Sequence, residues 1–455
     1  MGRTSETNFS RRLLLGGSAA AIGVGLAGAT VGQAAAAPAG EKISTAAQRG
    51  SVRKAISFLQ GVTDAYRDSG ARLVQSYMDN SGLQDIGFIY DNALTINALI
   101  AGGDLRRARA IGDALLYAQS HDADFTDGRL RQAYHADPER FVNADGTAHF
   151  GYEFGLVGTA VGDMSWSGIA LAQLARRVPR SDYLDGALRI GHWIVDNTRS
   201  TTGLGGYTFG ETEGLVDHKS TEHNIDVYGF FRLLARLTGD QRWNGRARHA
   251  LEFIEAVWNE DDGFFWTGSD DGAAINKNPL QLPLDVQTWF WLSVGKGAYA
   301  ECLDWASTNL RTTDTALRVN SNLTGNDTFT GAAFGSGTLR TDPKARVGGT
   351  EEWRPFPDDG GVWFEGTGQL ALALRKRDRN GDLAASDALL ATLKSSQEKL
   401  GAGQTFGGKR IEGGIQAASS AIDTGFGFAY NPHLHTAATS WYVMAATGFN
   451  PYRFS

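Results

Sequence analysis

The 455-residue chain has only one cysteine, Cys302, and therefore cannot form an internal disulfide. Small secreted domains take much of their stability from disulfides, so an exported chain of this kind needs a large buried core instead. Some 415 residues would remain after removal of an N-terminal leader. That length is ample for such a core, in one large domain or two.

Long apolar runs are also missing, because no stretch beyond the N-terminal leader approaches the length of a membrane-spanning helix. The leader itself has twin arginines at Arg11 and Arg12, a moderately apolar run rich in glycine and alanine, and small residues near Ala37. This pattern predicts a Tat-type export signal over residues 1–37 that is removed on maturation. We therefore expect a soluble, secreted protein.

Concentrated positive charge is absent. The net charge is −7, and loss of residues 1–37, which carry three arginines and one glutamate, would make it −9. The basic residues are scattered over an acidic body, which argues against nucleic acid or an anionic membrane as a partner.

Motifs for metals and phosphates are absent as well. The chain has no HExxH, no cysteine–histidine zinc spacing, no glycine-rich phosphate loop and no DDxxD sequence. Residues 378–389 resemble a calcium loop, but Leu383 and Leu389 replace the glycine and glutamate that such a loop needs. We therefore expect no metal and no cofactor.

Helical periodicity dominates what is present. Apolar residues recur at i, i+3, i+4 and i+7 through most of residues 46–455, and no period-two alternation is sustained. Six apolar segments with polar first turns alternate with six amphipathic segments. The predicted apolar helices cover 90–101, 164–177, 220–237, 284–294, 363–377 and 435–447, and the amphipathic helices cover 47–67, 105–119, 183–197, 243–258, 298–309 and 383–400.

The connections alternate in length. Short turns follow the apolar helices, whereas a long loop precedes each of them, at 68–88, 120–162, 199–219, 259–283, 310–362 and 401–434. Helices joined by short turns are antiparallel neighbours. If the apolar helices form an inner ring inside the amphipathic ones, all long loops and all inner-helix N-termini fall at one end. Loops of that length in a compact domain are usually functional.

The six-hairpin pattern resembles the (α/α)6 toroid of the six-hairpin glycosidase superfamily over the whole of residues 46–455. The motifs STEHN at 220–224, LDVQTW at 284–289, WFEG at 363–366 and HTAATSWY at 435–442 are similar to those of its secreted bacterial members. The resemblance implies an all-α, single-domain (α/α)6 barrel that follows a short linker at 38–45. It narrows the reaction less, because the fold also hosts lyases, epimerases and peptide cyclases.

Polar and aromatic residues gather at the starts of the predicted inner helices. They are Asp91, Asn92, Asp163, Trp166, Glu222, His223, Asn224, Asp226, Asp285, Gln287, Trp289, Trp363, Glu365, His435 and Trp441. Sugar hydroxyls need polar partners, and sugar C–H faces stack on aromatic rings. We therefore expect a carbohydrate to bind among these side chains.

Glycoside hydrolysis needs one carboxyl group that is protonated and one that is ionised. Glu365 follows Trp363 in an apolar sequence that should raise its pKa, which makes it the predicted proton donor. Glu222 lies at a helix N-terminus, where the helix dipole favours the anion, and is the predicted base. Asp285, on the inner helix between theirs, could replace either one.

Ring geometry favours an inverting reaction. With inner helices about 9 Å apart, alternate members of a six-helix ring lie on the order of 15 to 17 Å apart, and two inward glutamates would leave room for a water molecule. Inverting enzymes need roughly 6.5 to 9.5 Å between the carboxyls. A retaining pair stays open.

Two other functions stay open. In a lyase or epimerase on the same barrel, His223 and His435 would carry protons while a neighbouring Asn or Arg neutralises a uronate. A non-catalytic glycan-binding protein would use the same side chains without turnover. Any single carboxylate or tryptophan in the set could also serve only packing or capping. The leading hypothesis is a secreted, monomeric glycoside hydrolase that acts on a polysaccharide or oligosaccharide.

Overall fold

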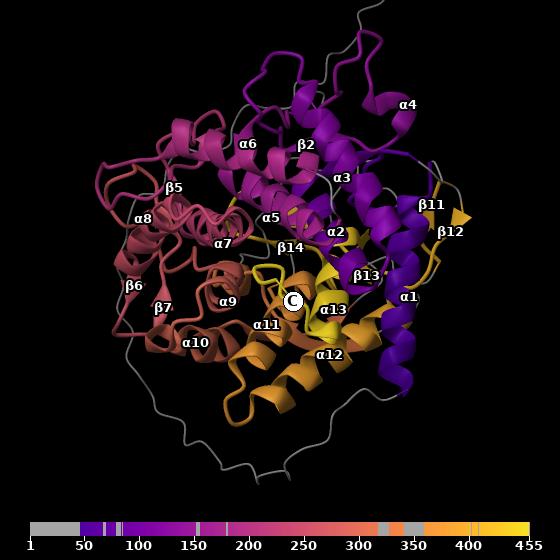
Figure 1. The fold of residues 1–455 in the computed structure, drawn as a ribbon. Coiled ribbons are helices and arrows are strands. Elements are labelled where there is room, and N and C mark those ends of the chain that lie inside the picture. Colours follow the sequence, from indigo (N-terminus) through magenta and orange to yellow (C-terminus); the bar gives the residue numbers. More distant parts are fainter. Residues whose placement is uncertain are drawn as a thin grey trace, which may run out of the picture.

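The computed structural model describes residues 46–66, 70–78, 83, 85–151, 155–178, 181–316, 327–340, 359–401, 403–407 and 409–454. The predicted signal at 1–37 and linker at 38–45 lie outside these ranges. Within them, twelve helices form two concentric rings, and a short extra helix, α4 (Pro138–Phe141), lies in the loop between α3 and α5 (Figure 1). The predicted all-α, (α/α)6 fold is confirmed.

The inner ring contains α2 (Ile89–Ala101), α5 (Val161–Arg177), α7 (Thr221–Thr238), α9 (Leu284–Ser293), α11 (Phe364–Arg377) and α13 (Thr436–Thr447). The outer ring contains α1 (Ala46–Thr63), α3 (Leu105–Ser120), α6 (Ser181–Thr198), α8 (Arg242–Ala256), α10 (Glu301–Asn309) and α12 (Asp382–Lys399). Each inner helix packs against two neighbours, and the ring closes where α13 meets α2. None of the described helices has the length and apolar character to cross a membrane.

Burial separates the two rings. The inner helix α2 is buried on nearly every side, because its sequence is apolar after the first turn. The outer helix α8 buries one stripe, with Trp243, Ala247 and Phe253 inward, and exposes the rest. A helix that is apolar all round belongs inside, and an amphipathic helix belongs outside. This difference in the sequence produces the order of the rings.

Short strands are confined to the long loops, where the described residues form eight antiparallel pairs. The pairs are β1 (Ile86–Phe88) with β2 (Ala133–His135), β3 (Thr159–Ala160) with β4 (Gly210–Glu211), β5 (Lys219–Ser220) with β8 (Gly268–Ser269), β6 (Trp258–Asn259) with β7 (Phe264–Phe265), β9 (Arg311–Ala316) with β10 (Asp327–Ala332), β11 (Thr405–Phe406) with β12 (Lys409–Arg410), β13 (Ile415–Gln416) with β16 (Leu434–His435), and β14 (Ile422–Asp423) with β15 (Ala429–Tyr430). Residues in β9 alternate between exposed and buried, so the expectation that period-two alternation is absent is wrong there.

The start of each inner helix is fixed by the loop that leads to the next inner helix around the ring. In each case the first helical N–H, which has no partner inside the helix, donates to a carbonyl of that loop. The six bonds run from Ile89 to Gln132, Val161 to Phe209, Thr221 to Thr267, Leu284 to Phe334, Phe364 to Ala417 and Thr436 to Ser76, at 2.8–3.1 Å. This cyclic pattern holds the six helix starts at one level.

Each inner helix is also tied to the loop that precedes it. The fourth residue of every inner helix accepts a backbone N–H from that loop. The pairs are Asn92 with Val74, Met164 with Leu130, Asn224 with Tyr207, Gln287 with Phe265, Thr367 with Ala332, and Thr439 with Ile415. The long loops are therefore bound to the barrel at two points per repeat.

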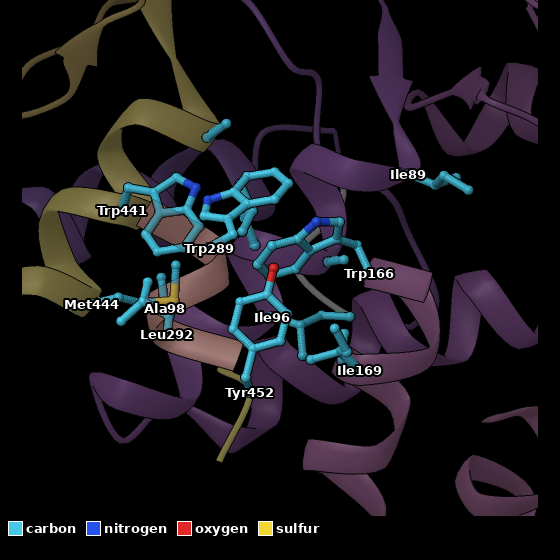
Figure 2. Packing of buried hydrophobic residues seen from close by; sticks show 14 of the residues in the cluster. Ile89, Ile96, Ala98, Trp166, Ile169, Trp289, Leu292, Trp441, Met444 and Tyr452 are labelled. Atoms are coloured by element: carbon cyan, nitrogen blue, oxygen red, sulfur yellow. The ribbon is translucent and has the colours of Figure 1, made fainter. Parts of the chain in front are cut away.

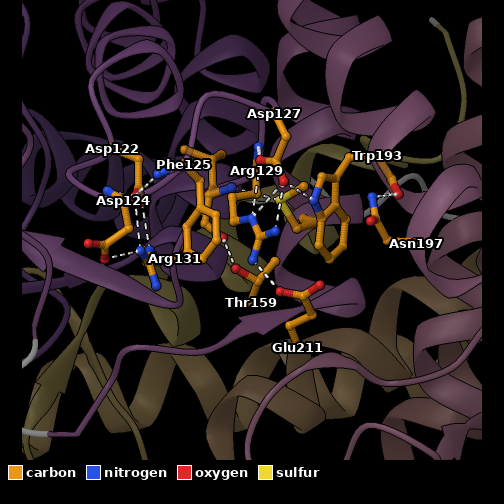
Figure 3. A network of polar contacts seen from close by, with 12 residues as sticks. Asp122, Asp124, Phe125, Asp127, Arg129, Arg131, Thr159, Trp193, Asn197 and Glu211 are labelled. Atoms are coloured by element: carbon orange, nitrogen blue, oxygen red, sulfur yellow. Dashed lines mark hydrogen bonds and ion pairs between the residues drawn. The ribbon is translucent and has the colours of Figure 1, made fainter.

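Buried arginines anchor the loop between α3 and α5 (Figure 3). Arg131 pairs with Asp122 at 2.6 Å, and Arg129 pairs with Asp127 at 2.7 Å. Arg129 also contacts Glu211, which lies in the loop before α7. These contacts join two neighbouring long loops outside the ring of helices.

The C-terminal segment 449–454 fills the opposite end of the barrel, and Figure 1 places the C-terminus in the middle of the ring. Arg453 donates to the Ser293 carbonyl at 2.7 Å, and the Gln173 amide donates to the Pro451 carbonyl at 2.7 Å. The buried Tyr452 hydroxyl donates to Asp226 at 2.6 Å. The end with the short turns is therefore packed with protein.

Candidate active site

A cavity of about 150 Å³ lies at the long-loop end, where the starts of α2, α5, α7, α9 and α11 meet the loops before α11 and α13. It is lined by Tyr90, Gly162, Asp163, Trp166, Glu222, His223, Asp285, Trp289, Phe334, Trp363, Glu365, Phe428 and Tyr430. The set includes all three predicted catalytic carboxylates. Four carboxyl groups thus surround one small space.

Register brings these carboxyls together. Glu222, Asp285 and Glu365 occupy the second position of α7, α9 and α11, and Tyr90 occupies the second position of α2. Because the helix starts are held at one level, equivalent positions face the same depth of the cavity. Asp163, at the third position of α5, adds the fourth carboxyl. Three different inner helices therefore each present an acid at the same height.

Tryptophans form the floor of the cavity, which Trp166 and Trp289 line, and Figure 2 shows these two rings packed with Trp441 and Tyr452. The ring centroids of Trp166 and Trp289 are 5.0 Å apart, and those of Trp166 and Trp441 are 5.8 Å apart. Tyr452 packs beneath at 5.1 Å from Trp166. The floor is thus an apolar, aromatic platform, and Trp441 supports it without lining the cavity.

Several polar atoms of the lining residues lack a hydrogen-bond partner in the described part of the chain. They are Trp166 Nε1, Trp289 Nε1, Trp363 Nε1, His223 Nδ1 and Glu365 Oε2, all of them buried. Buried polar groups are nearly always hydrogen-bonded in native proteins. A cluster of such atoms around one cavity is what a polar ligand or ordered water would satisfy.

Glu365 is held by its neighbours. Its Oε1 atom accepts hydrogen bonds from the Tyr90 hydroxyl at 2.5 Å and from the Gln369 amide at 3.3 Å. Burial raises its pKa to about 7, although the nearby His435 and the Tyr90 bond act in the opposite direction. The predicted direction of this pKa shift is therefore confirmed, and for the predicted reason, because the side chain is only 1 % exposed.

The expectation that its position at a helix N-terminus keeps Glu222 ionised is wrong. Ser220 caps α7 by accepting the His223 N–H at 3.2 Å. Burial and the nearby Asp285 and Asp226 nevertheless raise the pKa of Glu222 well above its usual range. Crowding with like charges and desolvation outweigh the helix dipole, which contributes at most ~2 kcal/mol.

Asp285 and Asp163 also titrate high. Burial raises the pKa of Asp285 to about 7, partly offset by the Val286 N–H, which donates to its Oδ1 atom at 2.7 Å. Burial, with Asp91 nearby, raises the pKa of Asp163 to about 7. The four carboxyls cannot all be ionised near neutral pH. Those with the highest pKa stay protonated and can donate hydrogen bonds.

Seven residues expected to bind substrate lie outside the cavity lining. They are Asp91, Asn92, Asn224, Asp226, Gln287, His435 and Trp441. Asn92, Asn224 and Gln287 bind loop backbone with their amides, and Asp226 Oδ1 accepts the Tyr452 hydroxyl, so these groups are used for structure. Trp166, His223, Trp289 and Trp363 do line the cavity, as expected.

Asp91 and His435 form a layer behind Glu365. His435 Nε2 lies 3.2 Å from Asp91 Oδ2, and His435 Nδ1 lies 3.8 Å from Glu365 Oε2. The His435 ring also stacks on Tyr77, with centroids 4.2 Å apart. The pair is therefore placed to orient Glu365 and not to touch a ligand directly.

The structural role of Asn224 can be tested by substitution. Its amide exchanges two hydrogen bonds with the Tyr207 backbone, at 2.8 and 3.0 Å. Asn224→Ala would leave both buried backbone groups unpaired, so we expect a loss of about 2 to 4 kcal/mol in the free energy of unfolding. Urea titration measures it, and the exposed Asn309→Ala is the control. Unchanged stability would instead favour a ligand-binding role.

Sequence patterns missed residues from the long loops. Phe334, Phe428 and Tyr430 line the cavity but lie in segments without helical periodicity. Gly162 was missed because glycine carries no functional group, yet a Cβ there would lie 2.4 Å from the His223 ring. The available signal was the run GFGFAY at 425–430, in which aromatic residues alternate with glycine and alanine.

In the described part of the chain, no group of three or more His, Cys, Asp or Glu side chains is placed to bind a metal.

Comparison with known proteins places the fold. No protein-family model matches the sequence, and no curated protein matches it. Similar solved structures include a glycosidase variant in complex with glucose, which has a TM-score of 0.56 and 12% identity and covers 90% of this chain and 99% of its own.

Two others are an α-amylase from Clostridium perfringens, with a TM-score of 0.53, 11% identity and coverage of 87% and 98%, and a family 76 α-mannanase from Bacteroides thetaiotaomicron, with a TM-score of 0.52, 11% identity and coverage of 88% and 95%. Structural similarity at such low sequence identity establishes the architecture of the chain and not its activity. The chain has the (α/α)6 fold of the six-hairpin glycosidases, as its hairpin pattern predicted.

Proposed function

We propose that this protein is a glycoside hydrolase that acts on neutral sugars. The observation that carries the proposal is the cavity itself. Four carboxyls with raised pKa values line it above a floor of tryptophans. Sugars need an aromatic face and several hydrogen-bonding groups, and glycoside hydrolysis needs a protonated and an ionised carboxyl together. The similar structures described as glycosidases, an amylase and a mannanase support the same reaction class.

Glu365 is the proposed proton donor. Its raised pKa keeps a large protonated fraction near neutral pH, and Tyr90 and Gln369 fix its orientation. The proposed base is Asp285, in place of Glu222. The Val286 N–H stabilises the Asp285 anion, whereas burial and the nearby carboxyls of Asp285 and Asp226 disfavour the Glu222 anion. Glu222 then stays protonated and donates a hydrogen bond to a sugar hydroxyl.

We propose inversion at the anomeric carbon, with a water molecule activated by Asp285. The anomeric form of the first product, followed by proton NMR in the first minutes, tests this stereochemistry. Retention would instead assign the second carboxyl as a nucleophile.

We also propose export of the mature protein by the twin-arginine route, on the strength of the N-terminal sequence.

The lyase or epimerase alternative is less favoured. A uronate needs a cation to neutralise its carboxylate, and no Lys or Arg is found among the described residues that line the cavity. Burial lowers the pKa of His223 to about 3, so this side chain is neutral at neutral pH and cannot serve as an imidazolium acid. His435 lies behind Glu365, outside the lining.

A substrate screen tests the proposal. The purified protein is incubated with a panel of neutral and acidic polysaccharides, and the products are analysed by mass spectrometry and a reducing-end assay. We expect new reducing ends from a neutral glycan. An unsaturated product absorbing in the near ultraviolet would indicate a lyase, and sugar binding without any product over days would indicate a non-catalytic glycan-binding protein.

The pH dependence of kcat/KM should show a bell centred near pH 7. Activity needs protonated Glu365, which is lost as pH rises through about 7, and ionised Asp285, which is lost as pH falls through about 7. Because the carboxyls interact, the two apparent pKa values of this pH profile describe the set of carboxyls and not single residues. With ordinary carboxyl pKa values the optimum would lie near pH 4. Full activity at pH 9 would contradict the assignment of Glu365.

A further inference from the structure

The cavity is small relative to a polysaccharide. Its volume of about 150 Å³ is below the ~300 Å³ at which pockets for drug-sized ligands begin. Glu365 is 1 % exposed and Asp285 is 5 % exposed, so both lie well below the surface. The tryptophan floor and Tyr452 close the space beneath them. A cavity of this size, with its carboxyls below the surface, suits a single sugar ring.

The walls above the carboxyls are aromatic. Phe334 packs on Trp363 at 4.7 Å and on Tyr430 at 5.9 Å between ring centroids, and Trp363 lies 5.7 Å from Tyr430. Phe334 and Trp363 are 6 % and 1 % exposed. These side chains form an aromatic wall on the side of the cavity where α11 and the loops before α11 and α13 meet.

Phe428 lies at the mouth of the cavity. It lines the cavity, yet it is 47 % exposed, the largest exposure of any aromatic side chain in the lining. Its ring lies 5.8 Å from Phe334 and 5.8 Å from Tyr430. An exposed aromatic face next to a buried polar cavity is suited to stack on a sugar that stays outside.

We propose that the cavity accepts only the terminal sugar of a chain and that Phe428 stacks on the second sugar, so that the enzyme releases monosaccharides from chain ends. This inference rests on the proposed hydrolase function. In the reaction the bond between C1 of the terminal sugar and the bridging oxygen breaks. The Glu365 proton goes to that oxygen, the water oxygen bonds to C1, and a water proton goes to Asp285.

Product sizes test the inference. The probes are linear hexasaccharides of glucose and of mannose, in α and β linkages, sampled at the first few per cent of conversion. We expect one monosaccharide and one pentasaccharide from each probe that is cleaved. Disaccharides to tetrasaccharides among the earliest products would overturn the inference while leaving the hydrolase proposal standing. If none of these probes is cleaved and the polysaccharide screen also yields no new reducing ends, both proposals are overturned.

The role of Phe428 is tested on the same probes. Phe428→Ala should raise KM for the hexasaccharide and for the matching disaccharide by roughly threefold to tenfold, because both place a sugar on the ring. KM for the glycosyl fluoride of the same sugar, which places no ring against Phe428, should rise less. The equally exposed Leu383→Ala on α12 is the control and should change neither value. Unchanged KM for the hexasaccharide in Phe428→Ala would contradict the stacking role.

Discussion

Glu365→Gln should lower kcat by about 10²- to 10⁴-fold while the protein stays folded, because the amide cannot supply a proton to the leaving oxygen. The substitution keeps the shape of the side chain, and its amide oxygen can still accept the Tyr90 hydroxyl. The measurement is the rate of reducing-end release at saturating substrate, on whichever glycan the screen identifies.

The control for this variant is Glu398→Gln. Glu398 is an exposed glutamate on α12 that pairs with Lys394, far in sequence from the cavity residues. It should retain wild-type kcat. Near-wild-type turnover in Glu365→Gln would reject Glu365 as the acid. A loss of activity accompanied by loss of circular dichroism would show a folding defect instead, and thermal unfolding of both variants separates these cases.

Asp285→Asn should abolish activity and also stabilise the fold above neutral pH. The pKa of Asp285 is about 7 in the native protein, against 3.8 without burial. Between these values the unfolded chain ionises while the native chain stays protonated, so native stability falls as pH rises from about 4 to 7 and then levels off. The asparagine does not ionise, and the gain approaches about 4 kcal/mol at pH 8.

Urea unfolding of Asp285→Asn and wild type at pH 4 and pH 8 measures this effect. The two proteins should differ little at pH 4, and the variant should be more stable at pH 8. The exposed Asp261→Asn in the β6–β7 turn is the control and should change stability by less than about 0.5 kcal/mol at either pH. Equal stabilities of wild type and Asp285→Asn at pH 8 would show that Asp285 is not held in a desolvated, crowded site.

The ring architecture could be predicted because it depends on how apolar residues are distributed within each helical segment. Segments such as 90–101 are apolar on all sides, whereas 243–258 carries a single apolar stripe, and burial in the structure follows that difference. The level of the helix starts was also predictable, since short turns force antiparallel neighbours. The hairpin of β9 and β10 was missed, although its first strand alternates buried and exposed residues.

The role of a polar residue at a helix start was much harder to predict. Asn224 and Glu222 lie two positions apart, yet one binds the Tyr207 backbone and the other lines the cavity. Whether a side chain binds loop backbone or lines the cavity depends on its angle around the helix axis. It also depends on the path of the loop, which has no periodicity in its sequence. A signal was available, because the fourth position carries Asn, Gln or Thr in five of the six inner helices.

Electrostatics at Glu222 could not be predicted from its own helix. The helix dipole and the Ser220 cap are local features, and both favour the anion. The competing influence comes from Asp285 and from burial, which depend on how α9 packs beside α7. For Glu365 the apolar residues next to it in sequence are also its neighbours in space, so the same reasoning succeeded.

The central claim is that the acidic first turns of the inner helices form one sugar-binding cavity. A crystal structure of Glu365→Gln with an oligosaccharide that the wild type cleaves tests it most directly. We predict one sugar ring above Trp166 and Trp289, within hydrogen-bonding distance of Glu222 and Asp285. A sugar bound elsewhere, with this cavity empty, would contradict the account.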